Sequence, residues 1–344
     1  MTETELTTRE SEVLEAVVRT FVETAAPAGS RTVAKRFDLG VSPATIRNTM
    51  SDLVEKGYLA QPHPSAGRMP TDKAYRYYVD LLMRVERLEP AELRRLARDL
   101  ESARMLEEEL LYRAVRALSV VTRELGVGMA PSVEETRLEK IELIGLSTDR
   151  LLLVLALEAG PVRTIFVEGS RKDAAAALDA AARWLNERLA GLTLEEVRET
   201  YRDRLADAPP EHADLLNIFL DQGETVFAPR PTREDVVLGP STQIASQPEF
   251  ADRDRLRSLL ELTERRDLLA EALRGREADG IVISIGGEHE VPPLVDFSLV
   301  STEYEMGATR GTIGVIGPTR MPYERVVALV EYTSRLLSSF SEPD

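Results

Sequence analysis

The segment from Ser42 to Val54 combines side chains that can read the edges of base pairs. If it is a helix, its apolar residues fall on one stripe, made of Ile46, Met50, Leu53 and Val54. The face outside this stripe is small, polar and cationic, and consists of Ala44, Thr45, Arg47, Asn48 and Ser51. In the major groove of duplex DNA an arginine can pair with guanine and an asparagine with adenine. The residues that we expect to read bases or to anchor this helix are Ser42, Thr45, Arg47 and Asn48.

Two further groups of donors flank this segment. After it, Tyr58–Gln61 and Arg68–Pro70 are predicted strands of a hairpin, and the turn between them is rich in proline and glycine. The hairpin carries three donors that suit phosphate or the minor groove, which are His63, Ser65 and Arg68. Before the segment, Ser30 and Arg31 begin a short helix whose first amides can hold phosphate groups.

The rest of the sequence offers little other chemistry. The chain has no cysteine, and its three histidines lack the spacing of metal ligands, so we expect neither a metal nor another cofactor. Ser284, Glu288 and His289 lie in one short segment, which we interpret as a loop because such close neighbours rarely converge on one substrate atom. The glycines between positions 307 and 317 do not have the spacing of a dinucleotide-binding turn. An enzyme is therefore the least favoured class.

Local signals predict the helices that position the DNA-contacting residues. Thr7 to Glu10 has the form of a capping box, and apolar residues then recur at helical spacing as far as Val22. Ser30 is the predicted N-cap of a second helix that ends at Phe37, with Val33 and Phe37 facing inward.

A third helix has equally sharp limits. Ser42 is its predicted N-cap, Pro43 its first residue and Gly57 its left-handed stop. Two short helices joined by a tight turn are typical of a helix-turn-helix, although a plain three-helix bundle has the same pattern. The hairpin that follows favours a winged helix-turn-helix over residues 1–86.

Thr71 can begin a fourth helix behind the hairpin. We expect Lys73 and Arg76 to stay near the DNA backbone. The residues of this helix that we expect to pack back onto the domain are Tyr75, Tyr78, Leu81 and Leu82.

Charge is distributed unevenly along the chain. The whole sequence of 344 residues carries a net charge of -16. Ser30 to Tyr78 contains eight basic and four acidic residues, hence +4, so the remainder carries -20. One cationic segment on an acidic body is what a protein needs if a single face is to meet DNA. The start of the chain is polar and acidic and no apolar stretch approaches the roughly 20 residues of a membrane span, so we expect a cytoplasmic protein.

The rest of the chain predicts an α+β, multidomain protein. Leu93 to Leu125 keeps helical spacing, as one long helix or two abutting ones. Strands are predicted at 138–146, 150–157 and 162–167, followed by helices at 173–189, 194–206 and 211–221. Further strands at 236–238, 280–285, 294–297, 299–306 and 309–316 enclose one helix at 252–274.

Two separated runs of residues resemble the HrcA family of heat-inducible repressors. The first comprises PAGSRTVAKR at 27–36, GVSPATIRN at 40–48, GYL at 57–59, QPH at 61–63, SAGR at 65–68 and PTD at 70–72. The second is GTIGVIGPTRM at 311–321. The resemblance implies a GAF-like domain formed by 87–137 and 225–344, with a dimerisation domain inserted at 138–224. It also implies that the protein binds the CIRCE inverted repeat upstream of chaperone operons as a homodimer. The GroEL chaperonin would maintain this repressor in its active form.

Two alternatives share the winged helix. A metabolite-responsive regulator would be switched by a ligand in the GAF-like domain. A scaffold would use its winged helix to bind protein in place of DNA, and the +4 segment argues against that.

Overall fold

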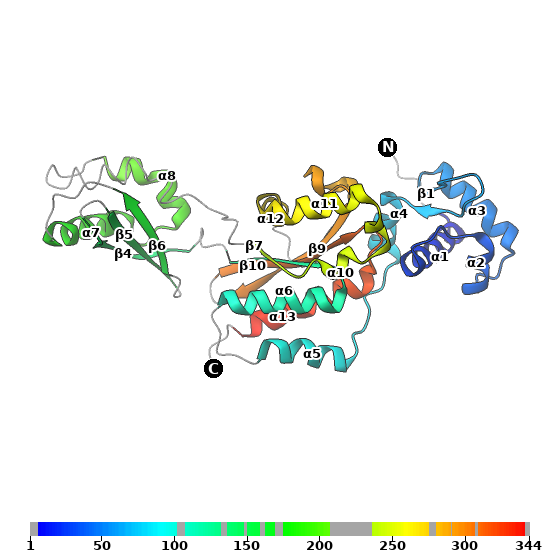
Figure 1. Ribbon diagram of the computed structural model, residues 1–344, viewed down its shortest axis with the longest axis horizontal. Coiled ribbons are helices and arrows are strands. Elements are labelled where there is room, and N and C mark those ends of the chain that lie inside the picture. The colour runs from blue at the N-terminus through cyan, green and yellow to red at the C-terminus, as the bar shows by residue number, and fades with distance from the viewer. Residues whose placement is uncertain are drawn as a thin grey trace. The chain divides into compact units, whose positions relative to one another are not determined.

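The computed structural model of the chain describes residues 6–101, 107–131, 136–147, 150–158, 162–168, 175–206, 236–274, 280–289, 291–306 and 309–340. Figure 1 shows its elements. The chain divides into two compact units. The first consists of residues 1–130, 233–304 and 312–339, and the second of residues 131–232, 305–311 and 340–344.

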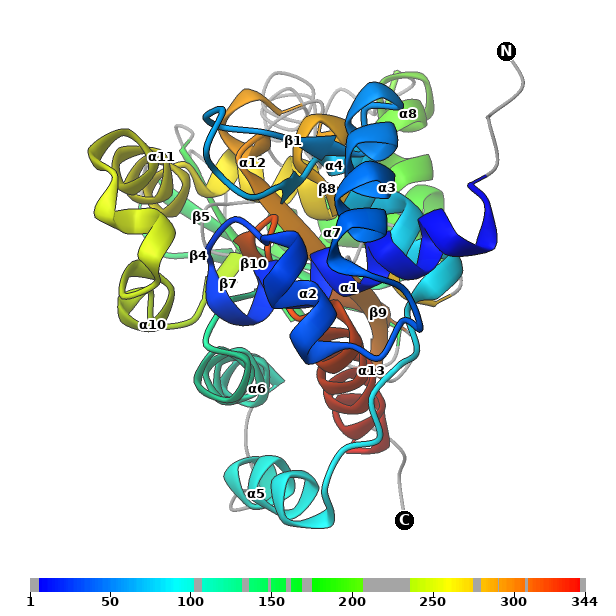
Figure 2. The ribbon, with the colours of Figure 1, turned by 90° about the vertical axis from the view of Figure 1, so that its right-hand side faces the viewer.

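The first unit begins with a winged helix. Its helices are α1 (Thr8–Thr24), α2 (Ser30–Arg36), α3 (Pro43–Glu55) and α4 (Asp72–Tyr77), and the strands β1 (Leu59–Ala60) and β2 (Met69–Pro70) pair antiparallel as the wing. Figure 2 shows this domain turned toward the viewer. The predicted capping box is present, because the Thr7 side chain accepts from the Glu10 amide while the Glu10 carboxylate accepts from the Thr7 amide. The core of the domain comprises Val13, Leu14, Val17, Val33, Ile46 and Leu53.

Three details of this domain differ from the prediction. The N-cap of α2 is Gly29, and Ser30 is the first helical residue. Phe37 is only half-buried, and the Arg19 guanidinium lies over its ring, 5.7 Å from the centroid. Beyond α4 the chain makes a π-helical turn (Tyr78–Leu82), which turns Leu81 outward and leaves it 68% exposed.

A five-stranded sheet follows in the same unit, in the order β7-β3-β10-β9-β8. Its strands are β3 (Leu125–Met129), β7 (Val236–Leu238), β8 (Val282–Ile285), β9 (Phe297–Met306) and β10 (Thr309–Pro318). On one face lie α10 (Thr242–Ala245), a 3-10 turn (Pro248–Ala251), α11 (Arg253–Glu264) and α12 (Arg266–Leu273). On the other lie α6 (Glu107–Thr122) and α13 (Tyr323–Ser339), with α5 (Pro90–Glu101) outside them (Figure 1).

The structure corrects several predictions in this region. For Leu93 to Leu125 the structure has the two-helix alternative, as α5 and α6, but Leu125 already belongs to a strand, β3. The predicted helix at 252–274 breaks at Arg265, whose backbone leaves the helical region. The predicted strand at 294–297 is wrong, because Pro292–Leu294 forms a 3-10 turn and β9 begins only at Phe297. The long helix α13 was not predicted.

The second unit contains a three-stranded antiparallel meander of β4 (Leu138–Gly145), β5 (Arg150–Leu157) and β6 (Val162–Glu168), as predicted. The helices α7 (Ala175–Leu189) and α8 (Leu194–Arg204) share a core with one face of this sheet. The predicted helix at 211–221 lies outside the described residues.

Among the residues that the structure describes, no helix has both the length and the apolar character that crossing a membrane requires.

Candidate nucleic-acid interface

Helix α3 is fixed at both ends and along its inner face. The Ser42 hydroxyl accepts from the Thr45 amide at 3.1 Å, Pro43 occupies the first turn, and Gly57 has a φ of +78°, as the sequence predicts. Ile46, Met50 and Leu53 are buried. The helix therefore presents one definite face outward.

Arg47 and Asn48 dominate that outward face. Both side chains are exposed, and among the described residues neither takes part in a hydrogen bond or an ion pair. Ser51 lies one turn further, but its hydroxyl donates to the Arg47 carbonyl at 3.1 Å. The donors of Arg47 and Asn48 are thus available to an external partner.

The two hydroxyls at the start of α3 serve the helix itself. Ser42 Oγ and Thr45 Oγ1 lie 3.0 Å apart within hydrogen-bonding distance, in addition to the N-cap bond. The four residues that the sequence predicts to read bases or to anchor α3 therefore fall into two pairs. Ser42 and Thr45 hold the helix start, while Arg47 and Asn48 extend from it.

The wing lies against the connection between α1 and α2. Ala28 and Arg68 exchange two backbone hydrogen bonds, of 2.8 and 2.9 Å. A Cβ on Gly67 would come within 2.6 Å of the backbone of Pro27 and Ala28, so no larger residue fits this contact. At the tip, His63 and Ser65 are exposed, and the Gln61 amide donates to the Pro64 carbonyl at 2.8 Å.

Arg68, Ser30 and Arg31 differ in what they offer. Arg68 is half-buried, and its Nη1 turns back to the Ala66 carbonyl, 3.5 Å away. Ser30 is buried at the first position of α2 and presents no open hydroxyl, whereas Arg31 beside it is exposed. Of the three side chains, the Arg31 guanidinium is the one most accessible to a phosphate.

Arg76 and Lys73, which we expected near the DNA backbone, both have partners within the protein. Arg76 donates to the Glu288 carboxylate at 2.8 and 2.5 Å and to the Ile283 carbonyl at 2.7 Å, which raises its pKa above its ordinary value. Lys73 lies 4.3 Å from the centroid of the Tyr58 ring and donates to the Lys56 carbonyl. The segment around Glu288, which we interpreted as a loop, is a 3-10 turn (Gly286–Glu288) that contacts the winged helix. Sequence reasoning missed this contact.

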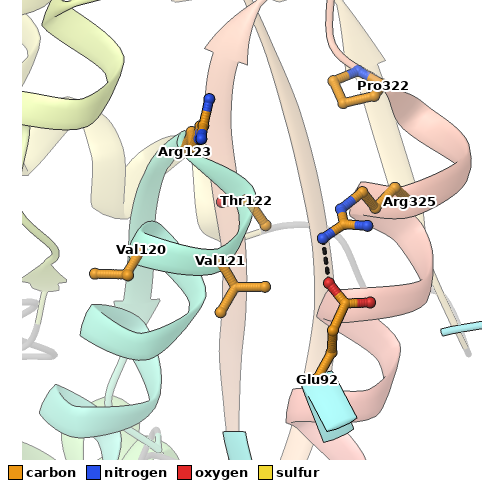
Figure 3. Close-up of a pocket in the computed structure, with 7 residues that line it drawn as sticks. All are labelled: Glu92, Val120, Val121, Thr122, Arg123, Pro322 and Arg325. Atoms are coloured by element: carbon orange, nitrogen blue, oxygen red, sulfur yellow. Dashed lines mark hydrogen bonds and ion pairs between the residues drawn. The ribbon is translucent and has the colours of Figure 1, made fainter. Parts of the chain in front are cut away.

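The sheet domain holds a cleft of about 470 Å³ between the end of α6 and the start of α13. Figure 3 shows its lining, with Val120, Val121 and Thr122 on one side and Pro322 and Arg325 on the other. The Arg325 guanidinium pairs with the Glu92 carboxylate and lies 3.7 Å from that of Glu86. Carboxylates therefore already neutralise this cation. Within the described part of the chain, no cluster of histidine and acidic side chains could hold a metal.

A winged helix that presents a free arginine and asparagine on a capped third helix defines a DNA-binding transcription regulator. Comparison with known proteins agrees. Residues 5–81 match the winged helix-turn-helix transcription repressor domain described as HrcA DNA-binding, and residues 108–327 match the HrcA protein C-terminal domain. The chain belongs to the HrcA family of heat-inducible transcription repressors, which is not a family of enzymes.

The match extends over nearly the full length of the relatives. The heat-inducible transcription repressor HrcA of Chlorobium phaeobacteroides (strain BS1) is 38% identical, over 97% of this chain and 98% of its own. That of Chlorobaculum tepidum is 37% identical, over 97% of each chain. A crystal structure of a hypothetical protein, 25% identical, aligns over 98% of both chains with a TM-score of 0.58.

Proposed function

We propose that this protein represses chaperone operons in the cytoplasm by binding the CIRCE inverted repeat as a homodimer. Each subunit inserts α3 into the major groove, and dimerisation sets the two helices about one duplex turn, roughly 34 to 36 Å, apart. The observation that carries the proposal is the pair of unengaged donors on Arg47 and Asn48, which extend from a helix fixed by the Ser42 cap and by its buried stripe.

The remaining contacts supplement this pair. Arg31, with the helix start at Ser30, holds a phosphate, and Ser42 and Thr45 anchor the recognition helix. His63 and Ser65 at the wing tip contact the backbone or the minor groove, and Arg68 supports the wing from its base.

The domain boundaries belong to the same proposal. Residues 1–86 form the DNA-binding domain, 87–137 with 225–344 a GAF-like domain, and 138–224 an inserted dimerisation domain. A sheet with helices on both faces supports the second, and the separate core of β4, β5, β6, α7 and α8 supports the third.

The open face of the three-stranded sheet supports dimerisation. In the register of the strands, Ile144, Leu152 and Phe166 form one row across this face, and Ala156 and Val162 belong to another. Phe166 is 63% exposed and Val162 is 62% exposed. Exposed apolar patches of this kind mark protein interfaces. In a symmetric dimer the patches of the two subunits would cover each other.

GroEL control follows if the active state is only partly populated. A chaperonin that binds inactive chains and releases active ones raises the active fraction, and heat diverts the chaperonin to other unfolded clients. The test is to heat the purified protein mildly until operator binding is lost, and then to add chaperonin with ATP. Recovery of binding supports this step, and recovery by cooling alone contradicts it.

The central experiment measures binding to a duplex that carries the inverted repeat from a chaperone promoter of the host and to a scrambled duplex of equal length, at one salt concentration. We expect the repeat to bind about 10³-fold or more tightly, the range of specific over non-specific binding. Equal affinity for the two duplexes contradicts the proposal.

A ligand-responsive regulator is the second candidate, favoured by the cleft between α6 and α13. A thermal-shift screen with metabolites distinguishes this candidate from a repressor controlled by the chaperonin. A compound that stabilises the protein and alters operator binding would favour this candidate.

A further inference from the structure

One arginine of the sheet domain contacts the backbone of the winged helix. Arg320 follows β10, and its guanidinium is largely buried, with 13% of the side chain exposed. Its Nη1 donates to the Val22 carbonyl in the last turn of α1, at 2.6 Å. Its Nε and Nη2 donate to the Glu249 carboxylate, and Nη2 also lies 3.2 Å from the Gln247 side-chain oxygen.

The Val22 carbonyl needs such a donor. It belongs to the last four carbonyls of α1, which lack partners within the helix. The amide of Ala26, which would continue the ladder, lies 3.3 Å from the Thr24 hydroxyl instead. A cation at a helix C-terminus also interacts favourably with the helix dipole. The planar guanidinium of an arginine can donate to the carbonyl, the carboxylate and the side-chain amide oxygen at once, whereas the ammonium of a lysine cannot.

Arg320 is itself held in place by hydrogen bonds among residues of the sheet domain. The Gln247 amide nitrogen donates to the Glu124 carboxyl at 2.9 Å and to the Arg123 carbonyl at 3.1 Å. Glu124 is buried between α6 and β3. The position of the guanidinium is therefore fixed by the sheet domain before it meets α1.

A second contact joins the two domains through α4. The Gly287 amide donates to the Asp72 carboxylate at 3.0 Å, and Arg76 is paired with Glu288. Gly286, with a φ of +53°, fits only because it lacks a side chain, since a Cβ there would lie 2.2 Å from the Asp72 carboxylate. Two polar contacts on two different helices restrict rotation of the winged helix on the sheet domain.

We propose that Arg320 is a positioning residue for operator binding, which fixes the direction in which each subunit presents α3. The inference rests on the proposed function, binding of a dimer to an inverted repeat. When two recognition helices are held at one separation, the second half-site is bound at high effective concentration. When they turn freely, that advantage is lost, although each winged helix keeps its own core and its own affinity for a half-site.

The test uses the full-length protein and three duplexes: a half-site, the inverted repeat, and a repeat whose spacing is altered by about 5 bp, half a helical turn. The key variant is Arg320→Met with Glu249→Gln. The single change Arg320→Met would leave the Glu249 carboxylate buried without its partner, and the second change removes that cost to folding. Arg320→Lys keeps the charge but not the planar guanidinium.

We expect the wild type to bind the repeat about 10²-fold or more tightly than the half-site, and to discriminate strongly against the altered spacing. In the double variant both preferences should fall to within about tenfold of unity, while half-site affinity stays within about twofold of wild type. Arg320→Lys should be intermediate. Leu337→Ala, which opens a cavity under α13 away from this contact, should lose stability but keep the spacing preference.

Two results would overturn the inference. One is a folded, dimeric double variant that still discriminates between the spacings as the wild type does. The other is a loss of half-site binding, which would mean that Arg320 supports the fold of the winged helix itself. A wild type that binds the repeat no better than the half-site would instead refute the proposed function.

Discussion

Arg47 and Arg31 are both exposed arginines of the winged helix, but their positions predict different contacts with DNA. Arg47 lies on the outward face of α3 and Arg31 at the start of α2. Replacing Arg47 by Ala should cost about 1 to 3 kcal/mol on the operator and little on random duplex, because a base contact is lost. Replacing Arg31 by Ala should weaken both alike and reduce the salt slope by about one.

Fluorescence anisotropy over a range of salt concentrations measures both quantities. Arg335→Ala is the control, since it removes an exposed arginine from α13 that pairs with Glu331, one turn away. Equal losses on both duplexes for Arg47→Ala would assign Arg47 to the phosphate backbone.

The buried carboxyl of Glu124 gives a pH-dependent prediction. Burial raises its pKa to about 8, from an ordinary value of 4.5. Between these values the unfolded chain releases the proton and the folded chain keeps it, so the free energy of unfolding falls as pH rises. Glu124→Gln has no proton to release, so its advantage over the wild type should grow between pH 5 and pH 8, by on the order of 3 kcal/mol.

Urea unfolding at the two pH values tests this. Glu331→Gln, which removes an exposed carboxylate of α13, controls for the change of net charge. A difference between Glu124→Gln and wild type that is the same at both pH values would show that the carboxyl titrates normally.

At the scale of residues, the sequence predicts burial that follows the helical period, and it misses contacts between residues far apart in the chain. The buried stripe of Ile46, Met50 and Leu53, and the exposed Arg47 and Asn48, follow from a period of 3.6. The pairing of Arg76 with Glu288 does not, because Glu288 lies 212 positions away. The sequence therefore predicted the cation of Arg76 but not the carboxylate with which it pairs inside the protein.

The wing as an element depends on Gly67. A Cβ at this position would meet the backbone of Pro27 and Ala28, which cannot move aside as a side chain can. Gly67→Ala should therefore displace the wing, with a loss of stability of about 1 to 3 kcal/mol typical of overpacking, and weaken operator binding.

Thermal unfolding and an operator titration measure the two effects. Gly29→Ala is the matched control, because its backbone φ is ordinary at -86° and its Cβ would meet nothing closer than the Thr32 hydroxyl at 3.8 Å. Similar losses in both variants would mean that backbone flexibility, and not the contact, is what Gly67 contributes.

Elements with local signals were predicted well, and those shaped by packing were not. The capping box at Thr7, Pro43 and Gly57 set helix ends through interactions within a few residues. Strand β3 continues the apolar spacing of the helix before it. It is a strand because it pairs with β10 and β7, and Gly126 and Gly128 let it lie so close to α6 that a Cβ on either would clash with Val115. No local signal reveals such an approach.

At the scale of the whole molecule, the open face of the three-stranded sheet should determine the oligomeric state. Phe166→Glu replaces an exposed apolar ring of the proposed interface by a charge, which is costly to bury against a second copy. We expect a monomer that binds a half-site as before and loses its preference for the repeat. Sedimentation equilibrium and the same titrations measure this.

Ala190→Glu, at an exposed turn after α7, adds the same charge away from that face and should remain dimeric. A Phe166→Glu protein that is still a dimer would place the interface elsewhere. The sequence predicted the meander and its helices here, but the register that joins Ile144, Leu152 and Phe166 into one row needs the paired strands.

The contact between Arg320 and the Val22 carbonyl joins residues 298 positions apart. At about 5 to 20 residues per second, a ribosome needs roughly 15 to 60 s to travel between them. During that time the nascent chain carries a complete winged helix that lacks its contact with Arg320. A messenger broken before codon 320 would therefore yield products that still bind a half-site but lack the preference for the full repeat.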